Sequence, residues 1–287
     1  MLPARSSLLH GCRRNATGLR MQDFWTALTT FALLVLSAWL GRFIRPRMPE
    51  TYRTRETIET MQLVIGLLVT FAALVLGLLT ASVKTSYDHA ARDRHAYALH
   101  LTLLDTCLRD YGPETVSARA DLARYTAAVI ASTWPREKPP AGISYPNTAG
   151  MPVVGASSVL ADLMDHIGQQ IRALDPRTSV AVNTANDCRV AYRDVQQARL
   201  SVIEDAGASF SAPLFWILVF WLTIAFLALG LAAPLNRVAA LGILLCALSL
   251  SSAVFVITDL SRPYRGLMAV SSGDMRDALA QMTARGE

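Results

Sequence analysis

The sequence predicts an all-α membrane protein with four transmembrane helices and a helical cytoplasmic insert between the second and the third. Three observations predict this fold class. Four windows are apolar enough to cross a bilayer, only 17% of the 287 residues are charged, and the segments between the windows carry helical apolar spacing with almost no strand-like alternation. A soluble domain carries charge at nearer a quarter of its positions.

Each of the four windows has about 20 mostly apolar residues, which is the length that a helix needs to cross the hydrocarbon core. The last three windows contain no charged residue, and the first contains only Arg42 near its end. A buried core helix is the alternative for any one window, but four such windows in one short chain favour membrane spans. The windows are residues 24–44, 61–83, 210–232 and 238–258.

These spans divide the chain into five segments. Residues 1–23 form a basic leader that we expect to be disordered, although residues 1–20 could instead reflect the choice of start site, since Met21 directly precedes the first span. Residues 24–83 hold the first two spans and residues 84–209 the helical insert. Residues 210–258 hold the last two spans, and residues 259–287 form an interfacial motif and tail.

The distribution of positive charge gives a weak orientation. With four spans, both termini and the insert lie on one side of the membrane. Nine Lys and Arg residues flank the spans on that side and six on the other, so the positive-inside rule narrowly favours a cytoplasmic insert. The nine are Arg20, Lys84, Arg92, Arg94, Arg193, Arg199, Arg262, Arg265 and Arg276, and the six are Arg42, Arg45, Arg47, Arg53, Arg55 and Arg237.

The insert is predicted to be a helical bundle fused to the spans. Apolar residues from Tyr97 to Tyr111 recur at spacings of four and three, so the second span continues as one long helix until Gly112 and Pro113 end it. We expect three further helices before the third span and a short helix near the C-terminus. They lie at about residues 113–134, 160–174, 177–205 and 274–282.

The sequence carries no recognisable catalytic or metal-binding motif. His89, His95 and His100 are six and five residues apart, whereas metal-binding pairs on a helix face need three or four. There is no phosphate-binding loop and no dinucleotide fingerprint. We therefore expect no enzyme activity, no catalytic residues, no metal and no cofactor. The basic residues form no aromatic-interleaved patch, so we expect no nucleic-acid binding.

The four cysteines predict neither a disulfide framework nor a zinc site. They are far apart in the sequence and show no CxxC or Cys/His ligand spacing. Cys246 lies within an apolar window, where we expect it to pack as a small hydrophobic side chain. The other three are Cys12, Cys107 and Cys188.

A compact polar motif follows the fourth span in "ITDLSRPYRGLMAVSS", residues 257–272. Arginine and tyrosine side chains anchor at lipid headgroups, and proline ends the helix. Such anchoring does not require these residues in this order. The motif residues that we single out are Asp259, Arg262, Pro263, Tyr264 and Gly266.

This ordered motif resembles the C-terminal signature of the bestrophin-like domain family, also called DUF4239, whose members are largely bacterial membrane proteins. Residues 74–88, 103–115 and 219–236 also resemble stretches of that family, in the expected order. The resemblance covers most of residues 24–283. One position departs from it: the family commonly has Asp directly before its Arg-Pro-aromatic sequence, whereas this chain has Ser261. A salt bridge made by that Asp is in doubt here, unless Asp259 substitutes.

Kinship to the bestrophins implies a homo-oligomer in the lipid bilayer, as a pentameric channel for small anions, in a bacterial inner membrane. In bestrophins the second span lines an apolar constriction, and the matching residues here are Leu67, Thr70, Phe71, Leu74 and Leu78. Lys84, Arg92 and Arg94 would place positive charge at the pore mouth. The acidic calcium-binding run of animal bestrophins has no counterpart in this chain. The alternative function is a non-conducting scaffold or sensor whose insert binds a cytoplasmic partner.

Overall fold

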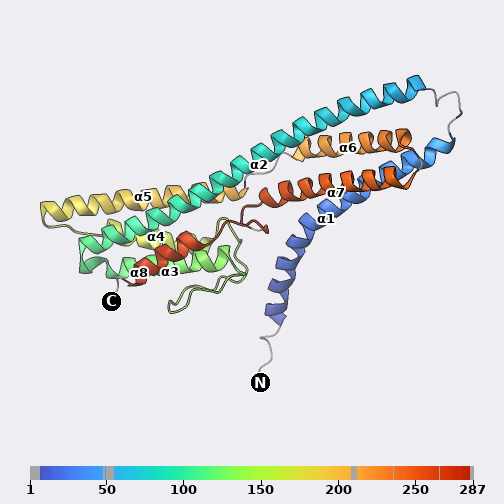
Figure 1. Cartoon of the computed structure of the whole chain (residues 1–287). Helices are drawn as coiled ribbons and strands as arrows, with labels where there is room; N and C mark the ends of the chain where they lie inside the picture. Colours follow the sequence, from blue (N-terminus) through green and yellow to red (C-terminus); the bar gives the residue numbers. More distant parts are fainter. Residues whose placement is uncertain are drawn as a thin grey trace. The chain divides into compact units, whose positions relative to one another are not determined.

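The computed structural model describes residues 7–47, 49, 55–207, 212–234, 236–264 and 266–284, and Figure 1 shows their arrangement into helices. The described residues contain no strand, and four helices are long and apolar enough to cross a membrane. The predicted all-α membrane fold with four candidate spans is therefore confirmed, whereas the cytoplasmic location of the insert stays a prediction. The chain divides into two compact units. We call Met1–Thr85 with Ser209–Leu267 the span unit, and Ser86–Ala208 with Met268–Glu287 the insert unit.

Four helices build the span unit around one apolar core. Helix α1 packs against both α6 and α7, and the core takes side chains from all four helices, among them Leu34, Leu79, Leu218 and Ile257. The helix faces that pack into this core are apolar, and the faces that point away from the core are apolar as well. Each helix therefore suits a lipid environment. The helices are α1 (Ser7–Ile44), the first part of α2 (Arg55–Tyr111), α6 (Ala212–Ala232) and α7 (Arg237–Leu260), with the 3-10 turn η1 (Arg45–Arg47) after α1.

Two glycines allow α1 and α6 to approach closely. A Cβ at Gly41 would overlap backbone atoms of α6, and a Cβ at Gly230 would overlap the backbone of Ala38. Small residues let membrane helices pack at short distance in this way. At Gly66, Gly77 and Gly242, by contrast, an added Cβ would meet no atom within 4 Å.

Arginines close the hairpin between α6 and α7. Arg42 donates to the carbonyl oxygens of Pro234 and Asn236, at 3.0 and 3.4 Å, and Arg45 donates to the carbonyl of Ala233. The Ala233 and Pro234 carbonyls directly follow the C-terminal end of α6, where positive charge is favourable, whereas Asn236 stands at the start of α7. The Asn236 side chain then caps α7 by accepting the Ala239 N–H at 2.8 Å.

The insert unit is a bundle around the second half of α2. As predicted, α2 continues without a break to Tyr111. Gly112 ends it with φ +124, a conformation that favours glycine, and Thr115 donates to the Leu108 and Gly112 carbonyls. The remaining elements are η3 (Pro113–Thr115), α3 (Val116–Thr133), α4 (Ser158–Arg172), α5 (Ser179–Gly207) and α8 (Gly273–Ala284).

The C-terminal helix α8 belongs to the insert unit and packs on α3. Met275, Ala278, Leu279 and Met282 are buried, so α8 presents one apolar face to the bundle. The chain leading to α8 is also held, because the Trp134 indole N–H donates to the Val270 carbonyl at 2.8 Å. The C-terminal segment and the insert are therefore one structure.

The N-terminal prediction needs a correction. We expected residues 1–23 to be disordered, but the backbone is helical from Ser7 onward. The segment contains no proline after Pro3, and adding residues to an existing helix costs little compared with nucleating one. Residues 1–6 lie outside the described part.

Candidate functional site

The residues predicted to line a pore share one exposed face of α2. Leu67, Phe71, Leu74 and Leu78 are 57%, 47%, 60% and 61% exposed, and Thr70 is also exposed. Their spacing of four, three and four residues places them along one stripe. The opposite face carries Ala72, Leu79 and Val83, which are buried in the core of the span unit. Phe71 contacts Trp221 of α6, with ring centroids 6.1 Å apart, and the leucines of the stripe stay largely exposed in the described part of the chain.

Polar groups on this part of α2 are satisfied within the helix. The Thr70 hydroxyl donates to the Gly66 carbonyl and the Thr80 hydroxyl to the Leu76 carbonyl, both at 2.8 Å. Residues 61–83 contain no charged side chain. The Thr70 hydroxyl is therefore already donating within the helix, and the exposed stripe is an apolar surface.

The open glycines lie beside this stripe. Gly66 and Gly77 are eleven residues apart, which is close to three helical turns, so they share a side of α2. A Cβ at either would meet no atom within 4 Å. The space beside Gly66 and Gly77, next to Leu67 and Leu78, is therefore open among the described residues.

The three predicted mouth charges have different environments. Lys84 and Arg92 are exposed. Arg94 is buried, and its Nη2 donates to Asp274 Oδ2 of α8 at 3.0 Å. His95 Nδ1 lies 3.3 Å from the same oxygen. Arg94 thus holds α8 against α2, and it differs from our expectation of a charge open to a pore.

The C-terminal motif wraps around Asp259. Asp259 is buried, and its Oδ1 accepts the Leu267 N–H at 2.7 Å. The Gly266 N–H donates to the Arg262 carbonyl at 3.3 Å, which closes the turn. A Cβ at Gly266 would come within 2.7 Å of Asp259 Oδ1, so only glycine fits beside this carboxylate. Tyr264 is buried as well. The order of the motif therefore has a packing reason in addition to anchoring at the headgroups.

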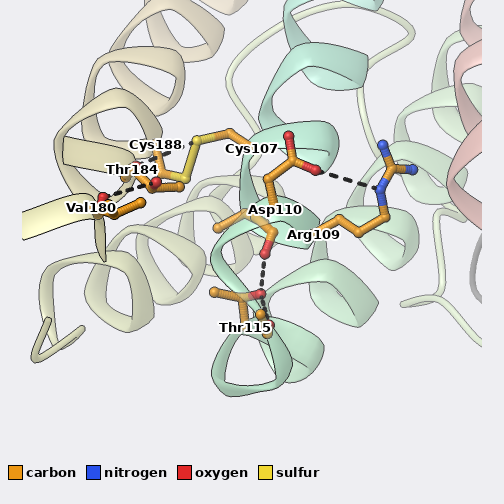
Figure 2. The surroundings of a disulfide bond; sticks show 9 residues. Cys107, Arg109, Asp110, Thr115, Val180, Thr184 and Cys188 are labelled. Atoms are coloured by element: carbon orange, nitrogen blue, oxygen red, sulfur yellow. Dashed lines mark hydrogen bonds and ion pairs between the residues drawn. A yellow bond between two sulfur atoms is a disulfide. The ribbon is translucent and has the colours of Figure 1, made fainter. Parts of the chain in front are cut away.

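A disulfide joins α2 to α5, which the sequence analysis did not predict. Figure 2 shows the bond between Cys107 and Cys188. The Cys188 side chain is fully buried, and Cys107 Sγ lies 3.6 Å from the Thr184 carbonyl oxygen. Spacing rules failed because the two cysteines are 81 residues apart and lie in different helices. The signal that was present is that each cysteine falls on the apolar stripe of its own helix, near Leu104 and Tyr192 respectively.

Two carboxyl groups of the insert unit interact. Burial, and after it the neighbouring Asp93, raises the pKa of Asp205 from 3.8 to about 6. His89 lowers this pKa and Glu204 raises it. Asp205 Oδ2 is buried with no hydrogen-bond partner in the described part of the chain. Asp205 on α5 and Asp93 on α2 therefore form a pair that holds a proton at mildly acidic pH.

A cleft of about 880 Å3 lies where α2, α4 and α5 meet, lined by Tyr111, His166 and Arg177 among others. At its rim, His166 Nδ1 lies 3.1 Å from buried Asp121, which also accepts from Gln170 at 2.8 Å. No set of three acidic, histidine or cysteine residues among those described could hold a metal ion. The cleft offers polar recognition but no metal site in this part of the molecule.

Residues 28–275 match the profile of the Bestrophin-like domain. The chain belongs to the bestrophin-like family. No match was found among curated proteins or among solved structures. The matched region of this bestrophin-like protein begins in α1 and ends in α8, so it includes all four candidate spans, the C-terminal motif and both cysteines of the disulfide.

Proposed function

We propose that this bestrophin-like protein is an oligomeric anion channel. The observation that carries the proposal is the uncharged face of α2 along a span, where Leu67, Leu74 and Leu78 are more than half exposed among the described residues, while Phe71 partly packs on Trp221 of α6. The four spans of one chain pack around side chains rather than around a channel, so conduction requires several copies. A ring of copies, five by the family resemblance, would bring this face of each α2 to a common axis.

Such a pore would have an apolar constriction followed by positive charge. Leu67, Phe71, Leu74 and Leu78 supply the constriction, and apolar constrictions gate by losing water. Lys84 and Arg92 attract small anions. We leave Arg94 out of the proposed mouth, because its charge is engaged by Asp274.

A non-conducting scaffold or sensor is the second candidate. Leu99 and Leu103 support it, because they lie one turn apart on α2 in the insert unit and are 50% and 49% exposed. Exposed apolar neighbours favour a protein partner. In the channel, a second copy of this chain could cover Leu99 and Leu103. In the scaffold, a different protein would cover them.

The remaining expectations concern chemistry and location. No enzyme activity and no cofactor are part of the proposal, since no catalytic motif occurs in the sequence. We propose a bacterial inner membrane, with the termini and the insert in the cytoplasm. The count of Lys and Arg residues near the span ends supports this orientation, with nine on the side of the insert and six on the other side. The Cys107–Cys188 disulfide opposes that orientation, because cytosolic thiols are kept reduced.

The test is halide flux into liposomes that contain the purified protein. Wild-type protein is compared with Phe71→Ala, which widens the proposed constriction. The matched control is Phe220→Ala, because Phe220 is a phenylalanine of a different span and is 61% exposed. We expect wild-type protein to pass chloride, Phe71→Ala to change the flux severalfold, and Phe220→Ala to leave it unchanged.

Correctly assembled wild-type protein that passes no ion would reject conduction and leave the scaffold. An equal effect of the two alanine variants would reject the assignment of α2 as the pore helix. An effect of Phe71→Ala alone supports that assignment if its unfolding temperature stays that of the wild type, because this variant also removes the ring contact with Trp221 of α6.

A further inference from the structure

The cysteine pair in the insert unit is positioned by the packing of two helices. Cys107 and Cys188 have Cα atoms 5.5 Å apart, within the range that a disulfide spans. Each cysteine has buried neighbours on its own helix, Leu104 and Leu108 on α2 and Ala185 and Tyr192 on α5. The bond therefore needs no change in the helical packing, and it forms wherever a suitable oxidant reaches the folding chain.

Disulfides of this kind persist in oxidising compartments and are rare in the cytosol. We infer that the insert unit, including α8, faces an oxidising compartment outside the cytoplasm, and that its folding includes oxidation by a thiol–disulfide exchange partner. In that step two cysteine thiols lose two protons and two electrons, and one S–S bond forms. The disulfide of the partner takes up the electrons and protons and becomes two thiols.

This inference reverses the orientation given by the arginine count. The positive-inside rule applies to short loops, and long segments cross the membrane largely regardless of their charge. The insert is a long segment, residues 84–209. The six arginines on the other side lie in, or at the helix ends beside, the two short connections from α1 to α2 and from α6 to α7, where the rule has most weight. They include Arg42, Arg45 and Arg237.

The inference does not depend on conduction, because an anion channel can operate in either orientation. For the scaffold or sensor, it requires that the partner of the insert lie outside the cytoplasm. It does extend to the C-terminus. α8 is joined to the bundle through Asp274 and Arg94, and through the Ser272 hydroxyl, which donates to Glu137. The C-terminal helix therefore lies in the same compartment as the disulfide.

The first test is the thiol state in living bacteria that express the full chain. Cys12→Ser and Cys246→Ser are introduced so that only the pair remains. Cells are quenched with acid, free thiols are blocked with N-ethylmaleimide under denaturing conditions, and the protein is then reduced and treated with maleimide-polyethylene glycol. We expect two polymer additions on the reduced sample and none when the reduction is omitted. A pair already blocked by N-ethylmaleimide would overturn the inference.

The second test reports the side of the membrane independently of the disulfide. In the same background, one cysteine is placed at Leu200, on α5 and 63% exposed, or at Val238, at the start of α7 and 77% exposed. Spheroplasts are treated with a membrane-impermeant maleimide before and after lysis. We expect Leu200→Cys to react before lysis and Val238→Cys to react only after it. The opposite pattern would overturn the inference even if the pair were oxidised.

Discussion

The turn after α7 places Gly266 beside Asp259, where there is no room for a side chain at position 266. The Asp259 carboxylate accepts the Leu267 N–H, and this places its oxygen against the Gly266 Cα. A buried carboxylate needs such hydrogen bonds, since an unsatisfied charge in this position would be costly. The motif that identified the family in the sequence is therefore also a structural requirement of the chain.

We predict that Gly266→Ala destabilises the protein by about 1–3 kcal/mol, because the added methyl overlaps Asp259. The measurement is the midpoint of thermal unfolding in detergent. The control is Gly242→Ala in α7, where a Cβ meets no atom within 4 Å; this change should stabilise the helix by at most about 1 kcal/mol. Equal effects at both sites would contradict the packing role of Gly266.

Asp205 gives a prediction about pH. Its native pKa of about 6 lies above its ordinary value of 3.8, so the native state holds an extra proton between these two values. The stabilisation from that proton is full below pH 3.8 and is lost as the pH rises through 6. At neutral pH, the charged Asp205 instead repels Asp93.

We therefore expect Asp205→Asn to raise the thermal stability at pH 8 and to flatten the dependence of stability on pH between 5 and 7. Thermal unfolding at several pH values measures this. Asp194→Asn, also on α5, serves as the control and should keep the wild-type profile. A profile of Asp205→Asn that falls as steeply as the wild type would show that the Asp93–Asp205 pair does not titrate in this range.

At the scale of elements, α2 connects the two units of the chain. Its first half packs on α1, α6 and α7, and its second half carries the core of the insert unit. Within the insert unit, the Tyr97 and Tyr125 hydroxyls lie 2.5 Å apart, which joins α2 to α3, and the disulfide joins α2 to α5. Both the next helix, α3, and the more distant α5 are thus held to α2 by specific bonds.

Loss of the disulfide should destabilise the insert unit. The bond links residues 81 positions apart, and a disulfide that closes a long loop typically contributes about 2–4 kcal/mol. We expect Cys107→Ser with Cys188→Ser, or treatment with reductant, to lower the unfolding temperature of the purified protein. Cys246→Ser, at the unpaired cysteine of α7, should not. An unchanged unfolding temperature in the double variant would mean that helix packing alone holds α5.

At the scale of the whole molecule, local patterns in the sequence predicted most of the helices. The stripe from Tyr97 to Tyr111 indicated the long α2, and Gly112 with Pro113 indicated its end. Each of these features depends on residues within a few turns of one another. The exposed stripe from Leu67 to Leu78 is different, because its assignment to a pore came from the family resemblance and stays a proposal.

The features that the sequence could not predict depend on tertiary neighbours. The partner of Cys107 lies in α5, and the partner of Arg94 lies in α8. Both pairs arise only after the bundle forms, and no spacing rule connects them. The open position of Gly66 and Gly77 likewise depends on how the span unit packs. The sequence alone does not distinguish a glycine that contacts another helix from one that faces lipid.

The central claim is that several copies assemble through the exposed face of α2. The most direct measurement is the native mass of the complex in mild detergent, corrected for bound detergent, for wild-type protein and for Gly77→Leu. We predict a closed assembly of about five chains of 31.2 kDa. Gly77→Leu should disrupt it, because the leucine side chain would occupy the open space beside Gly77 that close packing of a second copy would need. A stable monomer of the wild type across several mild detergents would contradict the claim, since one chain cannot enclose a pore.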